Sequence, residues 1–211
     1  MGHSSINSIP LSVPDLSIPE LEERMRPGAM SHGGFLGTTE SLGAVLIKDR
    51  HTLEEAQLTH SELADALDRV LQSALSQRRE SAPGRIRPYS ESVPMPDLRR
   101  PETVPRFSLD HLPDPERGHL VGGMLQVFFT VYRGFQPCPW CYDSTWGYFD
   151  FLILNRRSGE YITGPGLIVH LIREHQFFEG SGSPYRLEPL KAIRVLERVL
   201  AIDSATEEPA M

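Results

Sequence analysis

Cys138-Pro139-Trp140-Cys141 and, after a gap of 28 residues, His170-Leu171-Ile172-Arg173-Glu174-His175 are the two stretches that decide the fold of this 211-residue chain. The first stretch holds the only two cysteines, and two residues separate them. Zinc prefers four thiolate or imidazole ligands in a tetrahedron, and a Cys-x-x-Cys turn can direct two sulfurs at one ion. We therefore predict a zinc site with the ligands Cys138, Cys141, His170 and His175.

The two halves of this ligand set place different demands on the backbone. Pro137 and Pro139 stiffen the cysteine turn, which reduces the entropy that is lost when the turn is ordered. The histidines lie on a helix that we predict from Leu167 to about Phe177. Five positions along an ideal helix turn two side chains about 140° apart. The last helical turn must therefore loosen if both rings are to face one ion.

Other uses of the same residues are possible. A redox dithiol would place its first cysteine at the start of a helix, whereas the residues after Cys141 (Tyr-Asp-Ser-Thr-Trp-Gly) do not predict one. Two free thiols are the remaining non-metal alternative. A catalytic zinc ion keeps three protein ligands, a bound water and a nearby carboxylate as general base, here Glu174 or Glu179. Four available ligands favour a closed structural site over a zinc-dependent hydrolase.

Strand patterns surround the cysteine turn. Runs of β-branched and aromatic residues predict strands at 125–132, 148–154 and 160–162, and Thr163-Gly164-Pro165-Gly166 is expected to end the sheet. A last helix is predicted from Pro189. Over about residues 119–180, this order of strand, knuckle, hairpin and helix resembles the treble-clef or zinc-finger type of small metal domain. The resemblance concerns architecture and implies no functional residue.

Helical patterns dominate the N-terminal part. We predict helices from Pro19 to Pro27, from Thr39 to about Asp49, and from a capping box at Thr59–Glu62 to about Ser76. The third helix carries an apolar face that must be covered: Leu63, Leu67, Val70, Leu71, Ala74 and Leu75. The predicted fold class is α+β, with an acidic helical region at 1–77, a Pro/Arg-rich linker or arm at 78–118, a zinc-binding α+β domain at 119–203 and a disordered tail at 204–211.

The charge distribution limits the class of partner. The net charge is −7, and residues 1–77 hold 11 acidic against 5 basic side chains, which argues against a general nucleic-acid binder. A local basic face with aromatic groups keeps single-stranded nucleic acid as an alternative partner. Its members would be Arg173, Arg186, Lys191, Arg194 and Arg198, with Trp146 and Tyr185.

Targeting signals are not evident. No apolar run approaches the roughly 20 residues that cross a bilayer, and the N-terminus lacks a secretory pattern, so we expect a cytoplasmic protein without membrane contact. The sequence predicts a non-catalytic interaction or adaptor protein with a structural Cys2His2 zinc site, which binds a protein partner or a second copy. The alternatives are a nucleic-acid-binding regulator and a zinc-dependent hydrolase.

Overall fold

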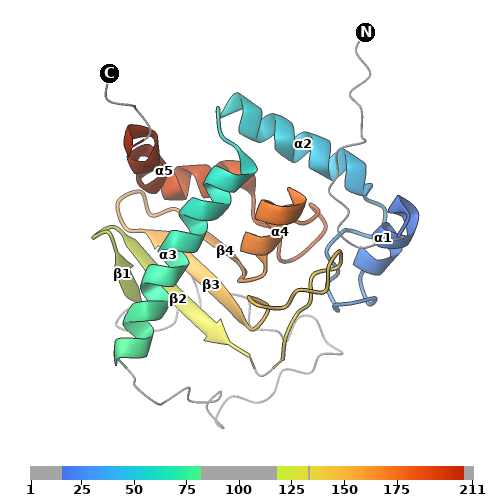
Figure 1. Cartoon of the computed structure of the whole chain (residues 1–211), viewed down its shortest axis with the longest axis horizontal. Coiled ribbons are helices and arrows are strands. Elements are labelled where there is room, and N and C mark those ends of the chain that lie inside the picture. The colour runs from blue at the N-terminus through green and yellow to red at the C-terminus, as the bar shows by residue number, and fades with distance from the viewer. Residues whose placement is uncertain (1–15, 82–117, 133, 207–211) are drawn as a thin grey trace.

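The computed structural model describes residues 16–81, 118–132 and 134–206 (Figure 1). The elements are α1 (Ile18–Met25), α2 (Leu42–Glu55), α3 (His60–Ser81), β1 (His119–Val121), β2 (Leu125–Val131), β3 (Phe149–Asn155), β4 (Tyr161–Pro165), α4 (Ile168–His175) and α5 (Pro189–Thr206). The strands form a four-stranded antiparallel sheet in the order β1-β2-β3-β4. Each strand pairs with its neighbour in the sequence, and the fold class is α+β.

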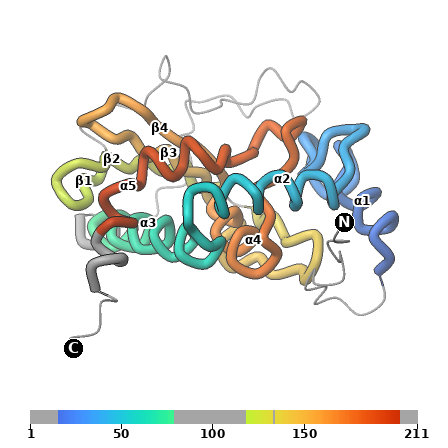
Figure 2. Tube along the Cα trace, turned by 90° about the horizontal axis from the view of Figure 1, so that it is seen from above, coloured from blue at the N-terminus to red at the C-terminus, as the bar shows by residue number. Residues whose placement is uncertain are grey.

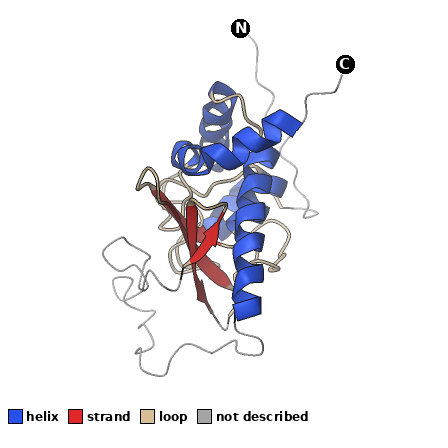
Figure 3. Cartoon of the chain, turned by 90° about the vertical axis from the view of Figure 1, so that its left-hand side faces the viewer, coloured by secondary structure: helices blue, strands red, loops and turns tan. Residues whose placement is uncertain are grey.

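The helices gather to one side of the sheet (Figure 3). α3 packs against β1, and α5 packs against β3 and β4. Because side chains alternate along a strand, Phe149, Phe151 and Ile153 of β3 all enter the core shared with the helices. Seen from above, α1 and β1 lie at opposite ends of the molecule (Figure 2). The cysteine loop between β2 and β3 lies at the α1 end.

The long helix α3 has the predicted apolar face, and this face is covered by the same chain. Leu63, Leu67 and Leu71 are fully buried, and α3 packs on α4, α5 and β1. The predicted capping box is also confirmed. The N–H and the hydroxyl of Thr59 donate to the Glu62 carboxylate at 2.6 and 2.7 Å. The N–H of Glu62 donates to the Thr59 hydroxyl at 3.2 Å. The helix continues to Ser81, past the end predicted near Ser76.

The start of α2 differs from the prediction. The helix begins at Leu42 with Ser41 as its N-cap, not at Thr39. The reason lies in Glu40, whose carboxylate accepts the N–H groups of Gly37, Ser181 and Gly182 at 2.7, 2.7 and 3.1 Å. These bonds hold the residues before α2 in a loop. They connect two segments that are distant in the sequence, so helix propensity alone does not predict them.

Three further differences concern strands β1 and β4 and the end of helix α5. β1 was not predicted, because three residues carry too little pattern. β4 continues through Gly164 to Pro165, where the sheet was expected to break. Because β4 is an edge strand, the missing N–H of a proline is tolerated there. α5 reaches Thr206, past the domain end predicted at 203.

Most of the predicted arm lies outside the described residues, at 82–117, and so does the end of the predicted tail, at 207–211. The division of the chain into 1–77, 78–118 and 119–203 stays a prediction. In the part of the chain that the structure describes, no helix is both long enough and apolar enough to cross a membrane.

A buried ion pair joins α2 to the loop before α5. The guanidinium of Arg186 meets both carboxylate oxygens of Asp49, at 2.6 and 3.0 Å, and the two side chains are 8% and 1% exposed. Arg186 also donates to the backbone carbonyl of Glu179 and, at 3.0 Å, to Glu188. Burial raises the pKa of Asp49, and the bonds from Arg186 oppose this shift.

Arg186→Ala should strongly destabilise the protein, because it leaves the Asp49 carboxylate buried without its cation. We expect a loss of about 3–5 kcal/mol in the free energy of unfolding, measured by urea denaturation. Arg194→Ala is the matched control, since Arg194 pairs with Glu160 at 2.8 Å but is 54% exposed. That variant should lose less than about 1 kcal/mol. Equal losses in the two variants would contradict the prediction.

Candidate metal centre

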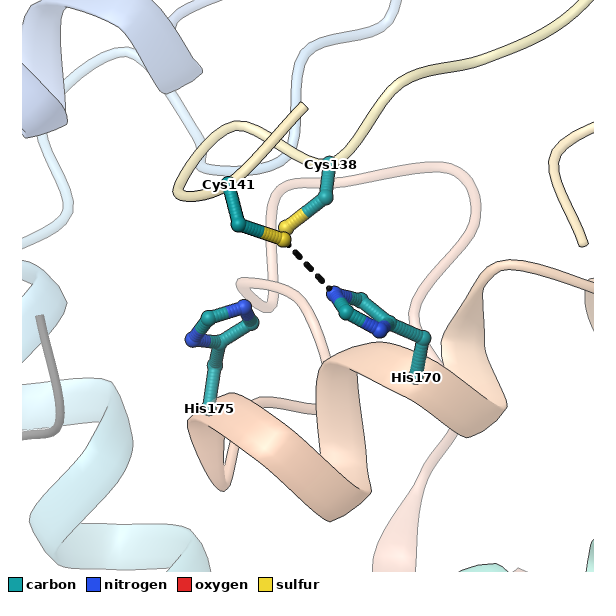
Figure 4. Close-up of side chains that lie close together, drawn as sticks. All are labelled: Cys138, Cys141, His170 and His175. Atoms are coloured by element: carbon teal, nitrogen blue, oxygen red, sulfur yellow. Dashed lines mark hydrogen bonds between the residues drawn. The ribbon is translucent and has the colours of Figure 1, made fainter. Parts of the chain in front are cut away.

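Cys138, Cys141, His170 and His175 lie together and face one another (Figure 4). The cysteines come from the loop between β2 and β3, and the histidines come from α4. One ligand atom from each residue lies within 4.8 Å of the other three. Cys141 Sγ and His170 Nε2 lie 3.2 Å apart. The four side chains are close enough to bind a metal ion.

The spacing of these atoms can be compared with a tetrahedral site. Bonds of about 2.0–2.3 Å to one zinc ion place ligand atoms roughly 3.3–3.8 Å apart. The 3.2 Å between Cys141 Sγ and His170 Nε2 lies just below that range. The 4.8 Å within which all four ligand atoms lie is about 1 Å above it. Small side-chain movements therefore suffice to close the cluster around an ion.

The cysteine turn is built to present sulfur. The backbone N–H groups of Trp140, at 3.4 Å, and of Cys141 point at Cys138 Sγ. Tyr142 donates its N–H to the carbonyl of Cys138 at 3.0 Å, and a left-handed backbone at Tyr142 (φ 59°) closes the turn. Burial raises the pKa of Cys138 to about 12, while the two N–H donors act in the opposite direction. A bound cation would supply the charge that a buried thiolate needs.

The end of α4 loosens as predicted. His175 is the last helical residue, and Gln176 follows in the left-handed conformation (φ 56°). The N–H of Gln176 reaches the carbonyls of Ile172 and Leu171, and the N–H of Phe177 also bonds to Leu171, at 3.1 Å. The two bonds to Leu171 span more than the usual four residues and widen the last turn. The rings of His170 and His175 thereby come to 5.1 Å between their centroids.

Trp140, between the two cysteines, covers the cluster from one side. Its ring is fully buried and stacks on His175, with 4.5 Å between centroids and 5° between planes. Phe177 packs edge-on against the same indole at 5.0 Å. The sequence predicts no role for Trp140, because an apolar residue inside a Cys-x-x-Cys turn does not reveal what it will contact.

α1 holds the outer side of the cysteine turn. Arg24 donates to the carbonyl of Pro139 at 2.9 Å, and its guanidinium lies 4.5 Å from the ring centre of Tyr142. Both contacts fall within or directly after the Cys-x-x-Cys turn. An N-terminal helix therefore packs on the loop that carries two of the four candidate ligands.

Asp143 is a further residue at the site, and the sequence did not predict it. Its Oδ2 lies 3.4 Å from Nδ1 of His170, and its Oδ1 accepts the N–H and hydroxyl of Thr145. Burial lowers the pKa of His170, and Asp143 acts in the opposite direction. The signal in the sequence was an Asp-x-Thr pattern that begins two residues after the second cysteine, which is typical of a side chain that bonds to the nearby backbone.

The same contacts would also fit a nucleophilic site, with Cys141 as the nucleophile, His170 as the base and Asp143 as the acid that orients the base. Nucleophilic catalysis by these three residues does not require Cys138 or His175. Metal binding uses all four ligand atoms, and the donor set of two sulfurs and two imidazoles suits it. The complete cluster therefore fits a metal centre better than a nucleophilic site.

The two carboxylates considered as general bases lie outside this cluster. Glu174 is exposed. Glu179 is buried and accepts a hydrogen bond from the hydroxyl of Ser183. Burial raises the pKa of Glu179 to about 8. Among the described residues, neither carboxylate belongs to the group of ligand atoms around the cysteines.

Three arginines of the expected basic face, Arg173, Arg186 and Arg194, are engaged in ion pairs. Arg173 bonds to Asp65 and Asp68 of α3, at 2.7 and 3.1 Å, and so connects α4 to α3. Arg194 and Arg186 have the acidic partners described above. These ion pairs reduce the positive charge that this face offers to phosphate groups.

Comparisons of the chain with protein-family models, curated proteins and solved structures found no match. Any assignment of function therefore has to come from the geometry and chemistry of the residues described here.

Glu179 should make stability depend on pH. Between its ordinary pKa of 4.5 and about 8, the folded protein keeps a proton at Glu179 that the unfolded chain releases. The free energy of unfolding contributed by this group is therefore largest at low pH and falls as the pH rises through that window. Glu179→Gln cannot titrate, so its unfolding free energy should fall less between about pH 5 and about pH 8, as measured by urea denaturation.

Glu174→Gln is the control for this measurement, because it removes a carboxylate from an exposed position of α4. It should keep the pH dependence of the wild-type protein. If Glu179→Gln has the same pH dependence as the wild type, a protonated Glu179 in the folded state is excluded.

Proposed function

We propose that this protein is a non-catalytic interaction or adaptor protein stabilised by a structural zinc ion at Cys138, Cys141, His170 and His175. The observation that carries the proposal is the approach of four ligand atoms to within 4.8 Å from two elements distant in the sequence. A zinc ion there would cross-link the cysteine loop to α4. The unfolded chain has no preformed site, so the binding free energy would add to the stability of the fold.

The donor set supports zinc over other common metals. Magnesium and calcium prefer oxygen ligands, whereas two thiolates and two imidazoles in a tetrahedron suit zinc. Four protein ligands also leave no open position for a reacting water, which favours a structural role. A cysteine knuckle between two strands, followed by a helix with the other two ligands, resembles the treble-clef or zinc-finger arrangement.

The interaction role is supported by exposed aromatic side chains near the cysteine turn. Tyr132, Phe135 and Tyr142 are 41%, 68% and 55% exposed. All three lie in the segment that runs from the end of β2 to the residue after Cys141. Apolar groups that gather on a surface are typical of protein contacts. A metal ion would hold the loop that presents them. We therefore assign protein binding, by a partner or a second copy, to this loop.

The two alternatives have weaker support. The net charge of −7 and the ion pairs of Arg173, Arg186 and Arg194 count against nucleic-acid binding. A mobility shift of single- or double-stranded nucleic acid that weakens with salt would favour that alternative. The hydrolase alternative requires a water on the metal next to Glu174 or Glu179, and neither residue joins the cluster described above.

Protein purified without a chelator should contain about one zinc ion per chain, bound by two sulfurs and two nitrogens. Elemental analysis and X-ray absorption measure these two quantities. Cys141→Ser should lose the zinc and melt at a lower temperature, because the metal contributes to folding. His51→Ala is the matched control: His51 is exposed on α2, and its removal should preserve both zinc content and melting.

Wild-type protein without stoichiometric zinc would overturn the proposed metal centre. A zinc ion with only three protein ligands and a water would instead support the hydrolase.

Replacing exposed aromatics should weaken association. We expect the double variant Phe135→Ser, Tyr142→Ser to shift a self-association equilibrium toward the monomer, because each change removes apolar surface from the contact. Sedimentation velocity over a range of concentrations measures this shift. Ile47→Ser, Leu190→Ser is the control, since these residues are 53% and 50% exposed on α2 and α5. A wild-type protein that is monomeric at every concentration would contradict self-association through this loop.

A further inference from the structure

We propose that Asp143 is the positioning residue of the metal centre, which holds His170 so that its Nε2 faces the ion. This inference rests on the proposed zinc site. It adds a fifth residue to that site, one that does not touch the metal. Asp143 would receive the Nδ1–H of His170 and so select the tautomer of the ring.

The two nitrogens of His170 face different partners. Nε2 lies 3.2 Å from Cys141 Sγ, on the side of the ligand cluster, and Nδ1 lies 3.4 Å from Asp143 Oδ2. A neutral imidazole that binds a metal through one nitrogen carries its proton on the other. Asp143 Oδ2 is therefore placed to accept a hydrogen bond from the Nδ1–H of His170. The distance slightly exceeds the usual 2.7–3.2 Å of a hydrogen bond, and we expect it to shorten when the ring moves onto the ion.

Asp143 is itself held in place. Its Oδ1 accepts the backbone N–H of Thr145 at 2.8 Å and the hydroxyl of Thr145 at 2.6 Å. These two bonds occupy one carboxylate oxygen and leave Oδ2 directed at His170. A carboxylate on a freely rotating side chain would fix the ring much less firmly.

The same residue also contacts the other half of the ligand set. The backbone carbonyl of Asp143 accepts the N–H of Cys138 at 2.7 Å. Asp143 thus touches one cysteine ligand through its backbone and one histidine ligand through its side chain. It is the residue through which the cysteine loop sets the orientation of a histidine on α4.

Asp143→Asn tests this role because it keeps the size of the side chain and removes its charge. The loss of such a carboxylate typically lowers metal affinity about 10–100-fold. We expect a decrease of that size for zinc, measured by competition with a chromophoric chelator. Glu174→Gln is the matched control. It removes a charge that also acts on His170, but from an exposed side chain. That variant should bind zinc with nearly wild-type affinity.

Thr145→Val is a milder second variant in case Asp143→Asn folds poorly. It removes the hydroxyl that anchors Oδ1 and keeps the backbone N–H, so we expect a smaller loss of zinc affinity. Nitrogen-15 spectra of the zinc-loaded proteins give a readout that general destabilisation would not move. The wild type should show His170 bound through Nε2, with an Nδ1 proton protected from exchange with water, and both Asp143→Asn and Thr145→Val should show faster exchange of that proton.

The outcomes separate the two proposals. If the wild type binds zinc but Asp143→Asn and Thr145→Val match Glu174→Gln in affinity and in proton exchange, the role of Asp143 is overturned and the zinc site stands. If the wild type binds no zinc, both proposals fail. Binding of His170 through Nδ1 would overturn the inference by itself.

Discussion

The stacking of Trp140 on His175 is the contact on which the arrangement of the site depends. It lies between a loop that leaves the sheet and the last residue of α4, and Phe177 closes its edge. A fully buried indole carries a large apolar surface, so it fixes the position of the cysteine turn strongly. With the turn in that position, both sulfurs face both imidazoles. Hydrophobic packing therefore brings the polar ligands together, and a metal ion would complete an arrangement that packing has begun.

A set of polar contacts holds the surrounding loops where helices and strands do not. Glu40 gathers three backbone N–H groups from two loops, and Arg186 connects Asp49 of α2 to the backbone after α4. Arg173 joins α4 to α3 in a similar way. The contacts of Glu40 with Ser181 and Gly182, of Arg186 with Asp49 and of Arg173 with Asp65 each join residues more than a hundred positions apart. Together they hold the helix that carries the histidines against the N-terminal helices.

This arrangement explains in physical terms how the proposed adaptor role could be carried out. The cysteine turn contacts α1 on one side through Arg24 and α4 on the other through Trp140. Exposed aromatic groups lie on the same loop. A metal ion at the centre would hold these parts in one geometry. A binding surface can then be presented by a short loop that has little secondary structure of its own.

The sequence by itself determined the parts that depend on local chemistry. The four residues that lie close enough to bind a metal ion followed from residue type and spacing, the capping box of α3 from Thr59 and Glu62, and the loosened end of α4 from helix geometry. The strands β2 and β3 followed from their β-branched and aromatic residues. Each of these features is encoded within a short window, where side-chain periodicity and backbone preference act directly.

Only the tertiary structure decided which distant groups meet. The late start of α2 depends on Glu40 reaching Ser181 and Gly182, and the roles of Trp140 and Asp143 depend on the position of α4. Three of the arginines expected to form a basic face, Arg173, Arg186 and Arg194, pair with carboxylates on other parts of the chain instead. A long-range contact of this kind has no periodic signal in the sequence. It exists because folding buries particular side chains side by side, and its partners are defined only when the core is formed.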